Sequence, residues 1–340
     1  MVKNNVTINS CIERLFGNIF DNSDITEIII NHQGLVIYED STGFKFGTEE
    51  ENSRVTKSNI EQFANALAVY SNQNISEKMP IMGGTLPGGE RVQVIRPPAL
   101  DQGQYSITIR KPSYRNLTLD DYQKSGFFDS LVMEKTKSPI DIKLAAYLDQ
   151  SDFSNFLKYA VETGEKNIII VGETGSGKTT LMKALIDFIP GHERLVTIED
   201  TRELFLRNHK NFVNLTYPQG ATFLDSLNAT TLLKSSLRMR PDRILLAELR
   251  GGETFDYINA VSSGHGGSIT SLHAGSVEEA FMRLSLMFLQ NETGSKIPYE
   301  TVKSIIENTI DIVLIIGFDA NGQRRIKTLH WKDYKKEDLH

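Results

Sequence analysis

The stretch that decides the fold of this chain is Gly172-Glu173-Thr174-Gly175-Ser176-Gly177-Lys178-Thr179. It matches the pattern G-x-x-x-x-G-K-[ST] at every defined position. The β-branched run at 167–171 precedes it and predicts a buried central strand, and a helix is expected over 178–188. A strand, a glycine-rich loop and a helix in this order are the context that a phosphate-binding loop requires.

The chemistry of such a loop explains its spacing. Glycines allow backbone N–H groups to point inward at phosphate oxygens, and the start of the helix adds its positive dipole end. Lys178 is expected to contact the β- and γ-phosphates, and the Thr179 hydroxyl to ligate Mg²⁺. The residues expected to bind the nucleotide are Gly172, Thr174, Gly175, Ser176, Gly177, Lys178, Thr179 and Thr180.

Two further predicted strands end in carboxylates. The apolar strand expected at 243–247 leads to Glu248, which has the form of a Walker B element, and the strand expected at 194–198 leads to Glu199. Ligands bind at the carboxyl ends of parallel strands. Glu248 and Glu199 are therefore expected to position or activate water and, with Thr179, to hold Mg²⁺, directly or through water.

A glycine-rich segment at 264–275 carries two of the chain's 7 histidines. His273 follows a predicted strand at 268–272, where it is suited to hydrogen-bond a γ-phosphate, whereas His265 is as well explained by a structural role. A structural interpretation also exists for Glu248, namely an ion pair with Arg250.

The alternation of strands and helices from about residue 153 predicts a parallel sheet wrapped by helices. The first third instead predicts an α+β domain, with a hairpin around 32–34, a helix at 56–70 and half-buried strands at 91–95 and 105–110. We expect an N-terminal domain at 1–125, a linker at 126–150 and a motor domain at 151–340. The remaining expected elements are strands at 310–316 and 324–331 and helices at 224–239, 253–262, 277–289 and 299–308.

Composition excludes several classes of protein. The chain has 340 residues, 39% of them hydrophobic, and a net charge of −6, so it can bury two cores but lacks the positive field of a non-specific nucleic-acid binder. A single cysteine, Cys11, excludes a disulfide framework and a multi-cysteine zinc site. No apolar run approaches the roughly 20 residues that span a bilayer.

The four elements together, in this order, resemble the secretion-ATPase superfamily, whose members carry Walker A, aspartate, Walker B and histidine boxes. The stretches 236–250 and 263–267 are most similar to the hexameric traffic ATPases of bacterial type IV secretion and conjugation systems, of the VirB/Tra kind. The resemblance is dense from about 168 to 283 and looser through 89–93 and 106–112. It implies an α/β chain in which a PAS-like N-terminal domain precedes a RecA-like P-loop ATPase, with ATP between the domains.

The resemblance also implies a homohexameric ring of two tiers at the cytoplasmic face of the inner membrane. Its expected partners are other ATPases and inner-membrane components of a secretion channel, with peripheral membrane contact and without direct nucleic-acid binding. Arg91 and Arg110 match the family's N-terminal arginines that reach the phosphates, which would make them arginine fingers on a movable domain. The long segment between the domains would also allow an N-terminal domain to cover its neighbour's motor domain.

Three alternatives fit parts of the pattern. A pilus-extension, pilus-retraction or type II secretion ATPase shares the four boxes, although many such members carry a tetracysteine zinc module that one cysteine cannot form. A RecA-like nucleic-acid translocase is disfavoured by the acidic balance and by the lack of a basic stretch interleaved with aromatics. A non-motor regulator or small-molecule kinase would use a phosphate loop without needing a ring.

Overall fold

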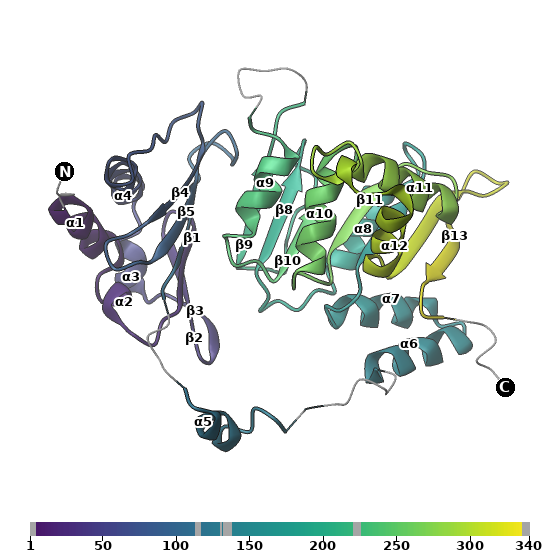
Figure 1. Ribbon diagram of the computed structural model, residues 1–340, viewed down its shortest axis with the longest axis horizontal. Helices are drawn as coiled ribbons and strands as arrows, with labels where there is room; N and C mark the ends of the chain where they lie inside the picture. The colour runs from purple at the N-terminus through teal and green to yellow at the C-terminus, as the bar shows by residue number, and fades with distance from the viewer. Residues whose placement is uncertain (1–4, 113–116, 130, 132–137, 220–225, 335–340) are drawn as a thin grey trace.

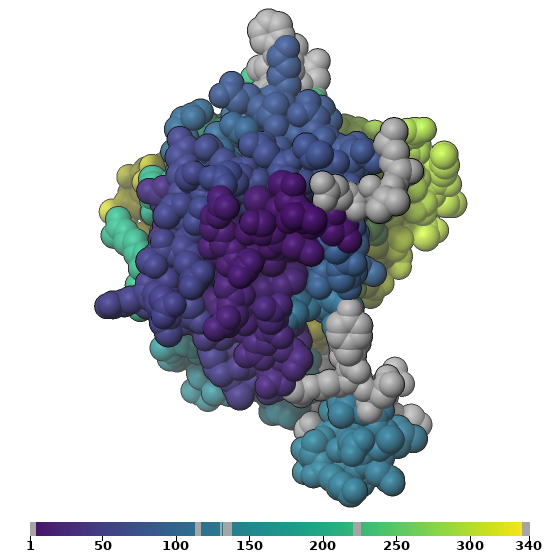
Figure 2. Space-filling view, turned by 90° about the vertical axis from the view of Figure 1, so that its left-hand side faces the viewer, coloured from purple at the N-terminus to yellow at the C-terminus, as the bar shows by residue number. Residues whose placement is uncertain are grey.

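The structure is a computed structural model that describes residues 5–112, 117–129, 131, 138–219 and 226–334. Figure 1 shows an N-terminal unit and a larger C-terminal unit, with α5 (Leu119–Lys124) lying apart from both. In Figure 2 the described residues around α5 form a separate lobe beside the N-terminal unit.

The N-terminal unit is one six-stranded sheet with helices on one face. The strand order is β3-β2-β1-β6-β5-β4, and helices α1 and α4 pack together over a core that they share with the sheet. The strands are β1 (Glu27–His32), β2 (Leu35–Asp40), β3 (Gly43–Phe46), β4 (Ile81–Thr85), β5 (Arg91–Ile95) and β6 (Ser106–Arg110). The helices are α1 (Asn5–Phe16), α2 (Asn18–Asp21), α3 (Glu49–Ser53) and α4 (Lys57–Tyr70).

Local sequence signals explain two of these elements. The β1–β2 hairpin turns at Gly34, whose φ of 80° favours glycine. Helix α4 begins after Thr56, whose side chain accepts a hydrogen bond from the backbone N–H of Asn59. The hairpin and the helix predicted from the sequence are both confirmed.

The prediction that β5 and β6 are half-buried is wrong, because both faces of these strands are covered. Val94 and Ile107 pack in the core beneath the helices. Gln93 and Thr108 lie opposite each other on the other face and are 3% and 1% exposed. That second face meets the C-terminal unit, which turns a polar strand face into a buried interface.

Arg194 is buried in this interface. It is 0% exposed, and its guanidinium donates to the side-chain oxygens of Asn31 at 2.8 Å and Asn211 at 2.5 Å, and to the Thr108 hydroxyl at 3.4 Å. Nearby, Arg240 forms an ion pair with Glu39 of β2. The two units are therefore joined through buried polar contacts rather than through the linker alone.

The C-terminal unit is a seven-stranded layer. Its strands form the ladders β10-β8-β9 and β11-β7-β12-β13, and β10 lies beside β11. All the ladders are parallel except β12–β13. The strands are β7 (Ile168–Val171), β8 (Leu195–Glu199), β9 (Phe212–Thr216), β10 (Arg243–Leu246), β11 (Ile269–Leu272), β12 (Ile312–Phe318) and β13 (Arg324–Trp331).

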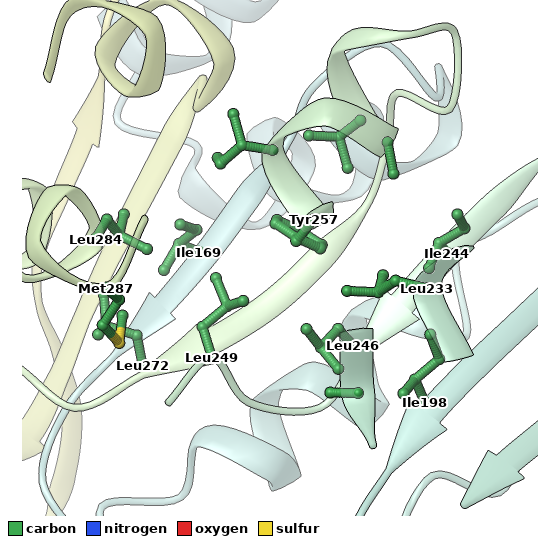
Figure 3. Close-up of a cluster of buried hydrophobic side chains, with 14 of the residues drawn as sticks. Ile169, Ile198, Leu233, Ile244, Leu246, Leu249, Tyr257, Leu272, Leu284 and Met287 are labelled. Carbon is green, nitrogen blue, oxygen red and sulfur yellow. The ribbon is translucent and has the colours of Figure 1, made fainter. Parts of the chain in front are cut away.

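Helices cover both faces of this layer, as the alternation predicts for a RecA-like domain. Ile169 and Val171 of β7 join the core beneath α9–α12, part of which is shown in Figure 3, whereas Ile168 and Ile170 join the core beneath α6–α8. The helices are α6 (Pro139–Asp149), α7 (Phe153–Glu162), α8 (Lys178–Ile186), α9 (Ala229–Ser236), α10 (Glu253–Ser262), α11 (Val277–Phe288) and α12 (Tyr299–Thr309).

Three differences from the sequence-based expectation concern this unit. Strand β9 and helix α7 are not predicted. The helix expected at 224–239 is shorter in the structure, where α9 is the part of that range that is helical. The first expected residues, 224 and 225, lie outside the described part of the chain. Helix α6 lies inside the expected linker, and its buried Leu144 packs against the C-terminal core. The bounds of the two domains stay a prediction.

None of the helices in the described residues is long and apolar enough to cross a membrane.

Candidate functional site

The glycine-rich loop leaves the end of β7 and enters α8. Gly175 and Gly177 have φ values of 76° and 99°, which L side chains rarely adopt. Gly172 is required for a different reason, since a Cβ there would lie 2.5 Å from the backbone oxygen of Ile316. These glycines let the loop curl against β12 and present Lys178 as the first residue of α8.

Lys178 is buried and turned back over the loop. Its Nζ donates to the backbone oxygens of Gly172 at 2.8 Å and Glu173 at 3.2 Å. Burial lowers the pKa of Lys178 from its ordinary value. The side chain thus lies where phosphate oxygens can replace carbonyl oxygens as its acceptors, as expected for a phosphate loop.

The other predicted nucleotide-binding residues line the same turn. Thr174 and Gly175 are exposed at the tip of the loop, and Ser176 is buried and donates to the backbone oxygen of Glu173 at 2.7 Å. Thr179 is half-buried and Thr180 is exposed, both in the first turn of α8. Thr179 therefore lies at the start of the helix, where the positive end of the helix dipole favours a bound phosphate.

Glu248 and His273 meet at the carboxyl edge of the sheet, next to Lys178. Glu248 follows β10 and His273 follows β11, and Nε2 of His273 lies 2.8 Å from Oε1 of Glu248. Nδ1 of His273 lies 3.3 Å from Nζ of Lys178. The structure thus joins the Walker A lysine to the Walker B glutamate through the histidine.

The chain of contacts continues away from the loop. Nη2 of Arg250 lies 2.6 Å from Oε2 of Glu248, and Nη1 lies 2.5 Å from a carboxylate oxygen of Asp200, which follows β8. The ion pair proposed as the structural alternative for Glu248 therefore exists, but it occurs together with the contact to His273. Asp200 and Arg250 are not among the predicted site residues, although Asp200 follows Glu199 at the same strand end and Arg250 is the predicted ion-pair partner of Glu248.

Glu199 has a different environment from Glu248. It is 1% exposed, and its Oε1 accepts hydrogen bonds from the backbone N–H groups of Glu203 at 3.0 Å and Leu204 at 2.9 Å. Its Oε2 is buried and has no hydrogen-bond partner among the described residues. Burial raises the pKa of Glu199.

Two predicted residues, Arg91 and Arg110, lie away from the phosphate loop, as does His265, for which a structural role is an equal alternative. Arg91 and Arg110 are paired across β5 and β6, and with His265 they line a cavity between the two units. His265 comes before β11, whereas the phosphate loop comes after β7, and these two strands are parallel neighbours. The structure therefore places Arg91 and Arg110 at the opposite edge of the sheet from Lys178 of the same chain.

Arg324, at the start of β13, is a cation that sequence reasoning missed. Its Nε donates to the backbone oxygen of Gly175 at 3.3 Å. Nothing in its own sequence neighbourhood marks it, because its position depends on the β12–β13 hairpin folding back over the loop.

The chain is similar to known proteins along most of its length. The family described as "Type II/IV secretion system protein" matches residues 22–316. The chain is 46% identical over 297 residues to the type IV secretion system protein VirB11 of Brucella abortus (strain 9-941), covering 86% of this chain and 81% of the relative. It is 40% identical over 318 residues to the type IV secretion system protein PtlH of Bordetella pertussis, covering 91% of each.

Among solved structures, the VirB11 ATPase of the Brucella suis type IV secretion system, crystallised in complex with sulphate, superposes with a TM-score of 0.89. It is 43% identical and covers 97% of this chain and 96% of its own. A match over nearly the whole chain includes both units and all the boxes identified above. The chain therefore belongs to the type II/IV secretion system protein family, and within it to the ATPases of type IV secretion systems.

Proposed function

We propose that this chain hydrolyses Mg-ATP and thereby powers a type IV secretion or conjugation machine, including substrate transfer and pilus biogenesis. The observation that carries the proposal is the continuous contact from Lys178 through His273 to Glu248. A γ-phosphate held by Lys178 would lie next to His273, so its presence or loss changes the contacts of Glu248.

The two carboxylates suit different tasks. Glu248 lies beside the Arg250 cation and next to His273, which suits it to orient the histidine and a water molecule. Burial raises the pKa of Glu199, which suits it to accept a proton from the attacking water.

The residues present fit a magnesium ion that is held jointly with the substrate. Within the described residues, no group of three or more His, Cys, Asp or Glu side chains could hold a metal by itself. Magnesium in nucleotide sites usually takes one or two protein ligands together with substrate phosphates and water. The Thr179 hydroxyl would bind the ion directly and Glu199 or Glu248 through water, and the bound ion would neutralise charge on the phosphates.

Arg91 and Arg110 are proposed to act on the nucleotide of an adjacent chain. Their place at the far edge of the sheet prevents contact with the phosphate loop of their own chain in this arrangement. Each N-terminal domain of a homohexamer would then cover a neighbour's phosphate loop, with the arginines closing when a γ-phosphate is present. The ring would work at the cytoplasmic face of the inner membrane, with other ATPases and membrane components of the channel.

Imaging and kinetics together test this proposal. We expect negatively stained particles of the full chain to be six-membered rings whose outline changes when Mg-ATP is added, and we expect phosphate release to require both ATP and Mg²⁺. Particles that stay monomeric with nucleotide, or hydrolysis that persists in EDTA, would contradict it.

A further inference from the structure

A cavity of about 840 Å³ lies between the two units, at the opposite edge of the sheet from the phosphate loop. It is lined on one side by β4, β5 and β6 and on the other by the connections that precede β10 and β11. Cavities that hold nucleotide-sized ligands are of this size.

The charged side chains that line the cavity are mostly positive, although the chain as a whole has a net charge of −6. The arginines are Arg91, Arg110, Arg238 and Arg240, and the acids are Glu27 and Asp242. An excess of arginine in a concave site of an acidic chain is the electrostatic arrangement expected for an anion.

Three of these arginines, Arg110, Arg238 and Arg240, differ in how far their charge is already neutralised. Arg240 forms ion pairs with Glu39 and Asp242. Arg110 is 72% exposed and has only a loose contact, 3.5 Å from Glu27. Arg238 is exposed, and its guanidinium has no hydrogen bond or ion pair with any of the described residues. Arg238 is therefore available to bind an anion.

Arg238 also reaches across the cavity to the N-terminal sheet. A Cβ on Gly83 of β4 would lie 3.0 Å from Nη1 of Arg238, so the guanidinium rests directly over that glycine. It faces the same space as Arg91 and Arg110, although it comes from the connection between α9 and β10. Both units of the chain thus contribute arginine side chains to the same cavity.

We propose that Arg238 is a further catalytic residue, a third cation that acts with Arg91 and Arg110 on the phosphates of the nucleotide bound by an adjacent chain. This inference rests on the proposed function of the two N-terminal arginines. It adds that one motor domain contacts its neighbour's nucleotide directly. Hydrolysis at one site would then depend on the position of the next motor domain as well as on that of its N-terminal domain.

Mixed rings of two inactive variants test the proposal. Arg238→Ala keeps an intact phosphate loop, and Lys178→Ala keeps an intact Arg238, so a ring containing both can form complete sites only between unlike neighbours. Each variant alone is expected to lose roughly tenfold or more in ATPase rate, in keeping with the loss of an arginine finger. The two variants are co-expressed with different tags, and mixed rings are purified through both tags. We expect these rings to regain about a quarter of the wild-type rate, because a random order places an intact arginine beside an intact loop at about one site in four.

Several controls separate the outcomes. Arg283→Ala, which removes an exposed arginine paired within α11, should leave the rate unchanged. Arg238→Lys should fall between wild type and Arg238→Ala, because it keeps the charge but not the planar fork. Wild-type activity of Arg238→Ala, or an absence of recovery in mixed rings, would overturn the inference. Wild-type activity of Lys178→Ala would instead overturn the proposed function itself.

Discussion

Nε2 of His273 lies 2.8 Å from Oε1 of Glu248, although the two residues follow different strands and are 25 positions apart in the sequence. The contact is possible because β10 and β11 are neighbours and both end at the same edge of the sheet. The same ring lies next to Lys178, whose Nζ is 3.3 Å from Nδ1 and 3.4 Å from Nε2 of the histidine. A single imidazole therefore lies beside both the lysine proposed to bind phosphate and the glutamate proposed to position water.

Replacement of Glu248 by glutamine should separate binding from chemistry. The substitution keeps the shape of the side chain but removes the charge beside Arg250 and His273. We expect ATPase turnover to fall by roughly a hundredfold or more, while the affinity for a fluorescent ATP analogue changes little. The control is Glu203→Gln, an exposed carboxylate on the loop after β8, which should turn over as wild type does. Unchanged turnover in Glu248→Gln would remove Glu248 from the mechanism.

His273→Ala should weaken the distinction between ATP and ADP. If His273 contacts the γ-phosphate, its loss reduces the affinity for a non-hydrolysable ATP analogue and leaves that for ADP nearly unchanged. Titration calorimetry with both ligands measures the ratio of the two dissociation constants. The matched control is His192→Ala, an exposed histidine in the connection before β8. An unaltered ratio in His273→Ala would show that the histidine does not sense the γ-phosphate.

Arg194→Ala should weaken the joint between the two units. The guanidinium is fully buried and satisfies Asn31, Asn211 and Thr108 at once, so its removal leaves polar groups without partners. We expect the free energy of unfolding to fall by about 2–4 kcal/mol and the segment between the units to be cut faster by protease. Arg54→Ala removes an exposed pair with Glu50 and should cost less than about 0.5 kcal/mol. Equal free energies of unfolding for Arg194→Ala and Arg54→Ala would contradict a structural role for Arg194.

Glu27 gives the stability of the protein a defined pH dependence. Burial raises its pKa from 4.5 to about 7, against the opposing charge of Arg110. The folded chain then binds more protons than the unfolded chain between these two values, so the contribution of Glu27 is complete below about pH 4.5 and is lost as the pH rises through 7.

Glu27→Gln removes this titration. We expect the variant to exceed wild type in free energy of unfolding by roughly 1–3 kcal/mol at pH 8 and by much less at pH 5. Urea unfolding at the two pH values measures both differences. If the difference in free energy of unfolding between Glu27→Gln and wild type is the same at both pH values, Glu27 is charged in the folded protein at pH 5 as well as at pH 8.

Much of the motor domain could be predicted because its signals are local. The phosphate loop is continuous in sequence, and the bounds of α10 and β13 agree with the prediction to the residue. Helix α6 could not be recognised, because its single buried residue, Leu144, finds its partners only in the folded core.

The site was predictable in its residue types but not in its contacts. Lys178, Glu248 and His273 are marked by their motifs, whereas the distances between them depend on strand order. The position of Arg91 and Arg110 depends on how the two units dock. That docking rests on contacts between residues far apart in the sequence, such as those of Arg194 with Asn31 and Thr108, rather than on any local pattern.

The most direct test of the account is the ATPase rate of Lys178→Ala, measured beside its thermal melting. We propose that this amine binds the phosphates of the nucleotide and that contacts run from it through His273 to Glu248. We therefore expect an ATPase rate at the background of the assay from a protein that melts as wild type does. A variant that hydrolyses ATP at the wild-type rate would contradict it.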